Sequence, residues 1–426
     1  MHAGGNWYTR TPLYLRIIIG LVLGLLLGLL LQHATPDPQS PPLWVARTIW
    51  WLNQSAKLLL QLLTMIAPPL ILLAVVRALV TADIGGKRAG RVIFLLILNT
   101  LVAILIGLLV ANVIRPGKHA NLKPNGDAPH VKGDPVESLL NNIPKSFIGP
   151  FTDEPNTIGV ILIALGVGLA VRQLEGHAIH SVIYATGIAF DIILIILHWV
   201  VQLVPIVVLA KVGAIVGQQG FGPFKALGWF ILAVLLALFL QACYYLIRIR
   251  VGSWVRPMQL LRGTRDALFL AFSTGSSTAA MPVTYQCLKD NVGLRPQSAS
   301  LGALVGSNFN NDGTALYEAM SALFVAQMIG QDLSITHQVV VVLTSVVAAV
   351  GAAGIPEAGL VTMTLVFTAV GLPVSYIVML LPVDWFLDRA RTAINVMGDM
   401  NVSCLLDGKE PAKNEDVAEP AEMAAA

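Results

Sequence analysis

Long apolar runs without a charged side chain are the feature of this sequence that most restricts its fold. They cover residues 17–31, 58–76, 92–114, 156–171, 192–210 and 226–247. Most approach the roughly 20 residues that a helix needs to cross the hydrocarbon of a bilayer. Only 12% of all residues are charged and 56% are hydrophobic, whereas about 25% of a soluble domain is charged. The sequence therefore predicts an all-α integral membrane protein whose surroundings are lipid.

Several other functional classes lack the residues that they need. The net charge of +3 is too small to indicate a nucleic-acid partner. Three scattered cysteines, with no CxxC spacing, predict neither a disulfide framework nor a zinc site. Neither HExxH, nor GxSxG, nor a Walker loop occurs, so we expect no enzyme and no cofactor, with an ion gradient as the driving force. A channel stays open as an alternative, because polar broken helices also line pores.

The distribution of lysine and arginine predicts the orientation in the membrane. Lys87, Arg88 and Arg91 follow the second run, and five arginines follow the sixth, whereas residues 33–42 contain neither lysine nor arginine. Because cytoplasmic loops carry the excess of these residues, we expect both termini in the cytoplasm of a cell (inner) membrane protein. No small-residue cleavage site follows the first run, so it is interpreted as a retained span.

Two apolar segments in the second half are interrupted where a spanning helix should be strongest. Residues 267–288 contain "STGSSTAAMP", and residues 333–383 contain "GAAGIPEAG". Irregular backbone at membrane depth is tolerated only where protein buries it or a wet cavity lies beside it. These segments predict helical hairpins that enter the membrane and turn back. Two ordinary helices with proline kinks are the alternative.

The last helix predicts a polar face inside the protein. Asp384, Asp388, Arg391, Thr392, Asn395 and Asp399 fall within an arc of about 100° at helical spacing, opposite an apolar face. A charge in the membrane costs about 2.5 to 3.5 kcal/mol unless it faces a cavity. A guanidinium binds a carboxylate through two hydrogen bonds, and an aspartate can bind an ammonium group. Arg391 and Asp388 therefore indicate a clamp for an amino acid.

The stretch "SNFNNDGTALYE" predicts a cation site beside this helix. Gly313 and the polar residues before it should unwind the chain, and Asn310 and Asp312 supply oxygen ligands. A buried amide network that only holds helices together is the alternative. Glu318 follows on the same helical face. Since burial favours the neutral form of a carboxyl group, it could carry a proton, or it could instead form an ion pair.

These motifs resemble those of the dicarboxylate/amino acid:cation symporters, which include the glutamate transporters. "STGSSTAAMPVT", "NNDGTALYE", "AAGIPEAGLVTM" and "DWFLDRARTAINVMGD" carry the resemblance, which extends from the first span to Asp407. It implies eight transmembrane helices plus two reentrant hairpins in a homotrimer that works by an elevator movement. It also implies a cytoplasmic N-terminus at 1–11, a mainly scaffold region at 12–247, a transport core at 248–407 and a disordered cytoplasmic tail at 408–426. The third span, 92–114, joins the transport part.

The resemblance also implies roles for individual residues. The substrate would lie against Ser276, Ser277, Thr314, Ile355, Asp388, Arg391, Thr392 and Asn395. One sodium site would consist of Gly306, Asn310, Asn395 and Asp399, and another of Asn99, Thr100, Asn310 and Asp312. Glu318 would carry a proton.

The expected substrate is an acidic amino acid, glutamate or aspartate, coupled to sodium or proton gradients or both. Asp388 implies an amino group, and Arg389, Gly275 and Glu318 resemble the arrangement in animal glutamate transporters. A C4-dicarboxylate or neutral amino-acid symporter of the same fold is the alternative. The chain departs from the family pattern at Asn308, Asn311, Ala349 and Glu357. These departures leave open a coupling led by protons, with fewer sodium ions.

Overall fold

The computed structural model describes residues 11–35, 41–81, 87–120, 144, 146–152, 157–174, 177–351 and 358–411. All regular structure within these ranges is helical, and they contain no strand. Five helical stretches in them are long and apolar enough to cross a membrane: Leu15–His33, Leu43–Arg77, Gly90–His119, Ala178–Gln218 and Phe224–Gly252. The prediction of an all-α protein with several apolar membrane helices is confirmed.

The first half of the chain consists mainly of long helices. They are α2 (Leu13–His33), α3 (Leu43–Thr81), α4 (Lys87–Ile114), α6 (Thr157–Val171), α7 (His177–Val201), α8 (Val204–Gln219) and α9 (Gly222–Gly252). Two short 3₁₀ helices, η1 (Pro116–Ala120) and η2 (Gly149–Phe151), follow α4. The predicted run 192–210 lies within the membrane-length stretch Ala178–Gln218, but it is divided, because α7 ends at Val201 and α8 begins at Val204. Pro205 lacks an N–H to donate, and its ring would collide with the carbonyl four residues earlier.

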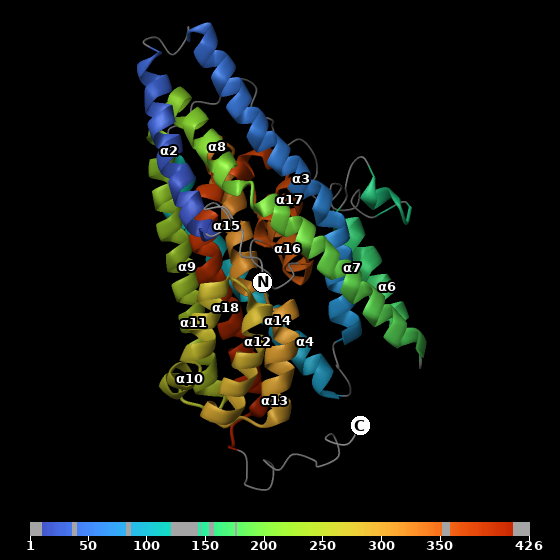
Figure 1. Cartoon of the computed structure of the whole chain (residues 1–426). Coiled ribbons are helices and arrows are strands. Elements are labelled where there is room, and N and C mark those ends of the chain that lie inside the picture. The colour runs from blue at the N-terminus through green and yellow to red at the C-terminus, as the bar shows by residue number, and fades with distance from the viewer. Residues whose placement is uncertain are drawn as a thin grey trace.

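Glycines let α2 and α8 pack closely side by side (Figure 1). A Cβ atom on Gly24 would lie 2.6 Å from the Leu209 carbonyl oxygen, and one on Gly20 would collide with the Pro205 carbonyl. Gly28 meets Val216 in the same way. Small residues at this spacing allow the backbones of membrane helices to approach each other. The "GLVLGLLLG" pattern is therefore a packing surface.

The second half is made of shorter helices around one buried helix. The elements are α10 (Pro257–Gly263), α11 (Arg265–Thr274), α12 (Ser277–Gln286), the π-helical η3 (Cys287–Val292), α13 (Pro296–Ser300), the π-helical η4 (Leu301–Val305), α14 (Gly306–Phe309), α15 (Asp312–Met328), α16 (Ile335–Gly351), α17 (Ala358–Ala369), the 3₁₀ helix η5 (Val374–Met379) and α18 (Leu381–Asp407). All of α15 is buried, and it contacts α4, α16, α17 and α18. It therefore lies at the centre of the second-half core.

The first predicted interruption is present, and glycine causes it. Gly275 separates α11 from α12 with a left-handed backbone, φ 65°, which glycine adopts without strain. Pro282 lies inside α12 and does not end it, so a proline kink does not account for this break. The second predicted interruption falls mostly on residues 352–357, which lie outside the described residues; α16 ends at Gly351 before them and α17 begins at Ala358 after them.

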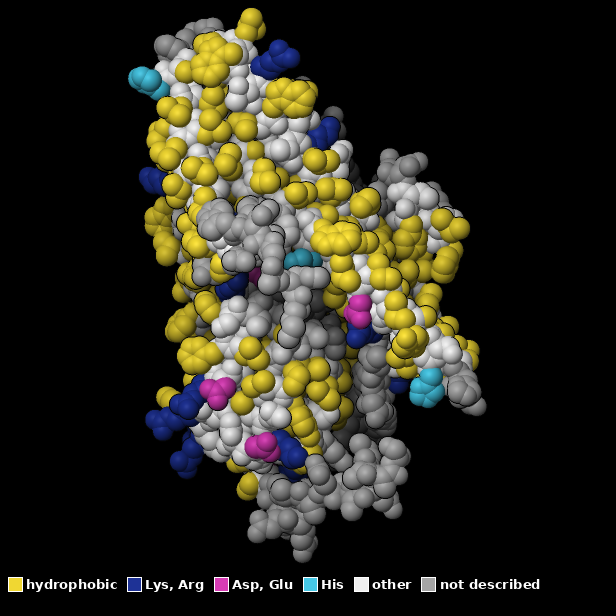
Figure 2. Space-filling view, viewed as in Figure 1, with side chains coloured by type: hydrophobic (Ala, Val, Ile, Leu, Met, Phe, Trp, Pro, Cys, Tyr) yellow, Lys and Arg dark blue, Asp and Glu magenta, His cyan; other side chains and the backbone are white. Residues whose placement is uncertain are grey.

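The surface of the protein agrees with a membrane setting. Hydrophobic side chains cover the upper helices in Figure 2, and lysine and arginine gather at the end of the molecule near α10.

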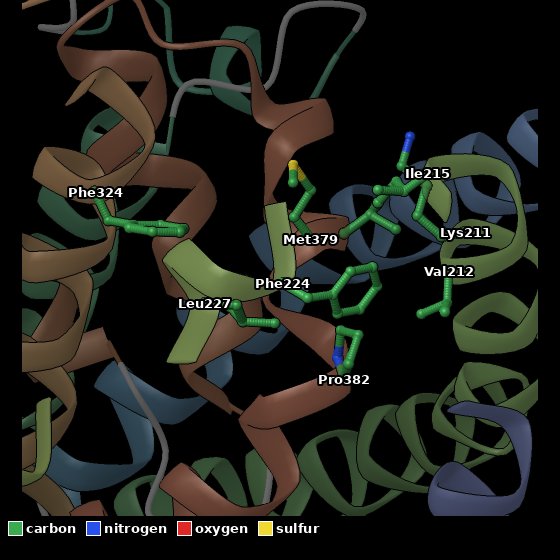
Figure 3. Close-up of a pocket in the computed structure, with 9 residues that line it drawn as sticks. Lys211, Val212, Ile215, Phe224, Leu227, Phe324, Met379 and Pro382 are labelled. Atoms are coloured by element: carbon green, nitrogen blue, oxygen red, sulfur yellow. The ribbon is translucent and has the colours of Figure 1, made fainter. Parts of the chain in front are cut away.

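A small, mainly apolar pocket lies where α8 and α9 meet the second-half core (Figure 3). Its lining is Lys211, Val212, Ile215, Phe224, Leu227, Phe324, Val378, Met379 and Pro382. None of the predicted site residues lines it, so the functional site must be sought elsewhere.

Candidate functional site

The polar face of α18 points into the protein, as the sequence predicted. Asp384, Asp388, Arg391, Thr392, Asn395 and Asp399 are all buried. The opposite residues Phe386, Ala390, Ala393 and Ile394 are only partly buried, although Met397 is buried as well. This face of the helix therefore brings three carboxylates and a guanidinium into the core. Because buried charges are stable only when they are paired or bind an ion, these groups need partners there.

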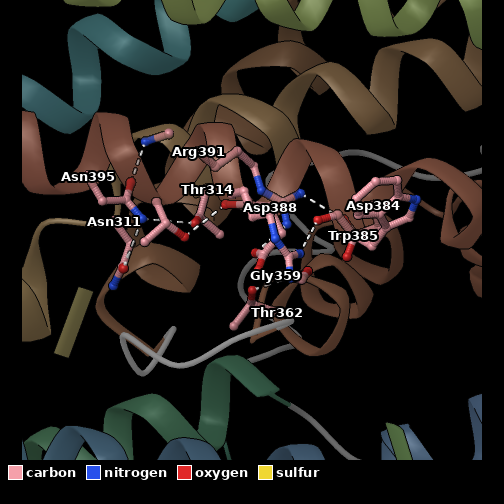
Figure 4. Close-up of polar contacts among 12 residues, drawn as sticks. Asn311, Thr314, Gly359, Thr362, Asp384, Trp385, Asp388, Arg391 and Asn395 are labelled. Carbon is pink, nitrogen blue, oxygen red and sulfur yellow. Dashed lines mark hydrogen bonds and ion pairs between the residues drawn. The ribbon is translucent and has the colours of Figure 1, made fainter. Parts of the chain in front are cut away.

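Arg391 is the most deeply buried of these charges, with an exposure of 0%. Its Nη1 lies 2.8 Å from Asp384 Oδ1, and its Nη2 lies 2.7 Å from Asp388 Oδ1. The guanidinium also lies over the Tyr317 ring, 3.9 Å from the ring centre. Figure 4 shows Arg391 between the two aspartates. The sequence placed Asp384 on the polar face but predicted no role for it. In the structure it forms an ion pair with Arg391.

The start of α15 packs directly on Arg391 and Asn395. The Gly313 N–H donates to Asn395 Oδ1 at 2.8 Å, and Asn395 Nδ2 lies 3.4 Å from Thr314 Oγ1. A Cβ atom on Gly313 would lie 2.7 Å from the Arg391 carbonyl oxygen, so α15 and α18 can approach this closely only through glycine. Gly359, at the start of α17, lies next to the Arg391 guanidinium (Figure 4).

The predicted substrate residues come together only in part. Asp388 binds Arg391 and accepts from the Thr392 hydroxyl through its carbonyl at 2.8 Å, and Thr314 and Asn395 form a second pair at the contact of α15 with α18. Ser276 caps α12 by accepting from the Ala279 N–H, and Ser277 donates to the Ser307 carbonyl at 3.1 Å. These serines therefore stabilise the turn between α11 and α12 and its contact with the segment before α15. Ile355 lies outside the described residues.

The first predicted sodium site is assembled around an unwound backbone. Asn310 and Asn311 have non-helical torsions and separate α14 from α15, as predicted. Asn310 Nδ2 donates to Asp399 Oδ1 at 3.1 Å and to the Asn395 carbonyl at 3.3 Å. Gly306 lies so close to the Asp399 carboxylate that a Cβ atom would collide with it. Asn310 Oδ1 is buried and has no hydrogen-bond partner among the described residues, which leaves an acceptor for a cation.

The second predicted sodium site is assembled too, but with additional partners. Asn99 and Thr100 lie on α4, and Thr100 Oγ1 donates to Asp312 Oδ1 at 2.6 Å. The Tyr245 hydroxyl of α9 donates to Asp312 Oδ2, and Arg248 of α9 donates to Asn99 Oδ1. Sequence reasoning missed both α9 residues. Arg248 had served only as a topology signal, although an arginine within a membrane helix is itself a functional indication.

Glu318 occupies a buried position between α15 and α17. Thr362 donates to its Oε1, while its Oε2 has no hydrogen-bond partner in the described part of the chain. The Arg391 charge acts on it from the same cluster. The alternative role for Glu318 was an ion pair. No salt bridge to Glu318 is found among the described residues, so the structure gives no support to that alternative.

Comparison with known proteins gives the family. The model of the sodium:dicarboxylate symporter family matches residues 13–409. This chain belongs to that family. The symporter is 30% identical over 404 residues to an excitatory amino acid transporter of Caenorhabditis elegans, covering 83% of this chain and 80% of the relative. It is 28% identical over 404 residues to excitatory amino acid transporter 3 of Homo sapiens, covering 80% and 76%. The protein is thus a membrane transporter and not an enzyme.

Two residues at which the symporter departs from the family pattern contact each other. Asn311 Nδ2 donates to the Ala349 carbonyl at 2.9 Å, which links the unwound segment to the end of α16. The Asn308 side chain and Glu357 lie outside what the structure describes. Within the described ranges, no group of three or more His, Cys, Asp or Glu side chains forms a metal cluster. The ligands at the two predicted cation sites are amides, carboxylates, hydroxyls and carbonyls, which suit a hard cation.

Proposed function

We propose that this symporter takes up glutamate and aspartate, driven by sodium or proton gradients or both. The observation that carries the proposal is the buried Arg391 guanidinium, held by Asp384 and Asp388 beside Thr314 and Asn395. A substrate carboxylate would replace an aspartate oxygen on the planar guanidinium, which suits two-point binding. The ammonium group would bind the Asp388 carboxylate thereby released.

Charge explains why such a substrate needs cations. Arg391, Asp384 and Asp388 together carry one net negative charge, and an acidic amino acid brings another. Opposite charges strengthen and like charges weaken binding far more at a buried site than in water. Sodium at Asn310 and Asp399, or a proton on Glu318, would offset the added charge. Substrate and cation are therefore expected to bind together, which is the basis of symport.

The same proposal covers the architecture that the family implies. We infer eight transmembrane helices, two reentrant hairpins formed by α11–α12 and α16–α17, and cytoplasmic termini. The 12–247 region would form most of a homotrimeric scaffold, and 248–407 would move as the transport core with 92–114. The contacts of α11 with α12 and of α16 with α17 support the hairpins, and the packing of α4 on α15 supports its place in the core.

Uptake by purified protein in liposomes tests this proposal. Labelled aspartate should accumulate saturably under an inward sodium or proton gradient, and unlabelled glutamate should compete. Competition by succinate alone would favour a C4-dicarboxylate symporter, and competition by alanine alone a neutral amino-acid symporter. Flux that follows the membrane potential without saturation would instead indicate a channel.

A further inference from the structure

The two predicted sodium sites share Asn310 and differ in the hydrogen bonds of their carboxylates. Asn310 Oδ1, which either site could use, is buried without a hydrogen-bond partner among the described residues. At the first site, Asp399 accepts a hydrogen bond from the neutral Asn310 amide. At the second, Thr100 and Tyr245 donate one hydrogen bond to each oxygen of Asp312. Buried polar groups are normally satisfied. Asp312, which belongs to the second site alone, therefore already has a donor on each of its oxygens, whereas one amide is the donor found for Asp399 among the described side chains.

A positive side chain lies at the second site. Arg248, half-buried on α9, donates from Nη1 to Oδ1 of Asn99, one of the predicted sodium ligands. Its charge also attracts the Asp312 carboxylate. A guanidinium keeps its charge at every physiological pH. Arg248 therefore supplies at this place the single positive charge that a bound sodium ion would bring.

The neighbouring helices hold this arrangement in position. Asn99 Nδ2 lies 3.4 Å from Asn401 Oδ1, and Asn401 Nδ2 donates to the Tyr245 carbonyl at 3.0 Å. A Cβ atom on Gly398 would lie 2.9 Å from both Asp312 Oδ2 and the Tyr245 hydroxyl, so α18 packs tightly against them. Hydrogen bonds thus join α4, α9, α15 and α18 in this cluster, and the cation within it is the Arg248 side chain.

We propose that Arg248 is a built-in cation that replaces the sodium ion of the site predicted at Asn99, Thr100, Asn310 and Asp312. This inference deepens the proposed function and rests on it, because it concerns the ions that drive uptake. Like charges disfavour a sodium ion beside the guanidinium. A cation that belongs to the chain is never released to the cytoplasm, so it contributes nothing to the gradient-driven cycle. Of the two predicted sodium sites, the symporter therefore uses only the one at Asn310 and Asp399 to couple uptake to sodium.

Counting bound sodium on the purified, full-length protein tests this inference. Equilibrium binding of radioactive sodium, without amino acid, is compared for the parent, Arg248→Met and Arg250→Met. Arg250 is an exposed arginine two residues further along α9 and controls for loss of charge. We expect Arg248→Met to bind about one more sodium ion per protomer, with a steeper titration. Equal sodium counts for the parent and a folded Arg248→Met would overturn the proposal.

A second comparison decides the matter if Arg248→Met fails to fold. It uses Asp399→Asn and the double variant Asp399→Asn with Asp312→Asn, which keep the side-chain shapes. If sodium still binds to Asp399→Asn but not to the double variant, Asp312 binds sodium and the proposal is overturned. If Asp399→Asn binds no sodium, or if the double variant binds as much sodium as Asp399→Asn, the proposal is supported. Sodium is counted without amino acid, so the result is independent of whether acidic amino acids are the substrate.

Discussion

At the scale of single residues, the buried Arg391 depends on the two carboxylates that neutralise it. Asp384 and Asp388 lie within 2.8 Å and 2.7 Å of the guanidinium. Removing one member of a buried ion pair costs about 3 to 5 kcal/mol, because it leaves an uncompensated charge. A substitution that keeps the charge therefore separates substrate recognition from stability better than truncation to alanine does.

Arg391→Lys should weaken uptake of aspartate and glutamate by at least about tenfold while the protein still folds. Lysine keeps the positive charge but cannot form the planar, two-point contact with a carboxylate, and one lost charged hydrogen bond costs about 1.5 to 3 kcal/mol. Initial rates of labelled aspartate uptake measure this, with the exposed Arg250→Lys as a control. Unchanged acidic uptake by Arg391→Lys would contradict the clamp.

Glu318→Gln should remove the pH dependence of uptake. If Glu318 carries a proton inward, uptake by the parent rises as the external pH falls, because the protonated form enters with the substrate. Among the described residues, Thr362 donates to Glu318 Oε1 and the Arg391 charge acts on Glu318. Glutamine imitates the protonated carboxyl group, so the variant should give a flat profile in uptake and exchange assays across neutral pH. A variant that keeps the parent's pH profile would make Glu318 a structural residue only.

At the scale of elements, the close packing of α15 on α18 depends on glycine. Gly313→Ala places a Cβ atom 2.7 Å from the Arg391 carbonyl oxygen, where only backbone movement can relieve the overlap. Overpacking of this kind costs about 1 to 3 kcal/mol, so the thermal midpoint should fall and uptake should be lost. Gly228→Ala on α9 is the control, because nothing lies within 4 Å of the added atom. Equal midpoints for the two variants would show that α15 and α18 have room to separate.

The sequence predicted those features that depend on a single segment of the chain, such as the buried face of one helix or a break between two helices. The 3.6-residue repeat of α18 identified its buried face, and Gly275 and the polar residues before Gly313 marked the breaks, because these signals are local. The division at Pro205 was missed, since the apolar run continues through it without a charge. The partners Tyr245 and Arg248 were also missed. Their contacts with Asp312 and Asn99 join α9 to α15 and α4, and no local pattern encodes a pairing between distant segments.

At the scale of the whole molecule, the buried charges of several helices act together. α15 contributes Asp312 and Glu318, and α18 contributes Arg391 and four aspartates, Asp384, Asp388, Asp399 and Asp407. The half-buried Arg248 of α9 lies beside them and donates to Asn99. Each carboxylate that lacks a cation partner in the chain raises the affinity for a cation from solution. Asp399 is such a residue, because only the neutral Asn310 amide is found donating to it among the described side chains. Sodium affinity and substrate affinity should therefore be coupled through Asp399.

Asp399→Asn should abolish most of this coupling. In the parent, saturating sodium should strengthen aspartate binding by a factor typical of linked sites, about 5 to 150. In the variant the factor should fall toward one, because the site loses the charge that holds the ion. Calorimetry of aspartate binding at low and saturating sodium measures the factor. Linkage requires aspartate to strengthen sodium binding equally, so the reverse titration is an internal control. An unchanged factor in Asp399→Asn would mean that the coupling ion binds elsewhere.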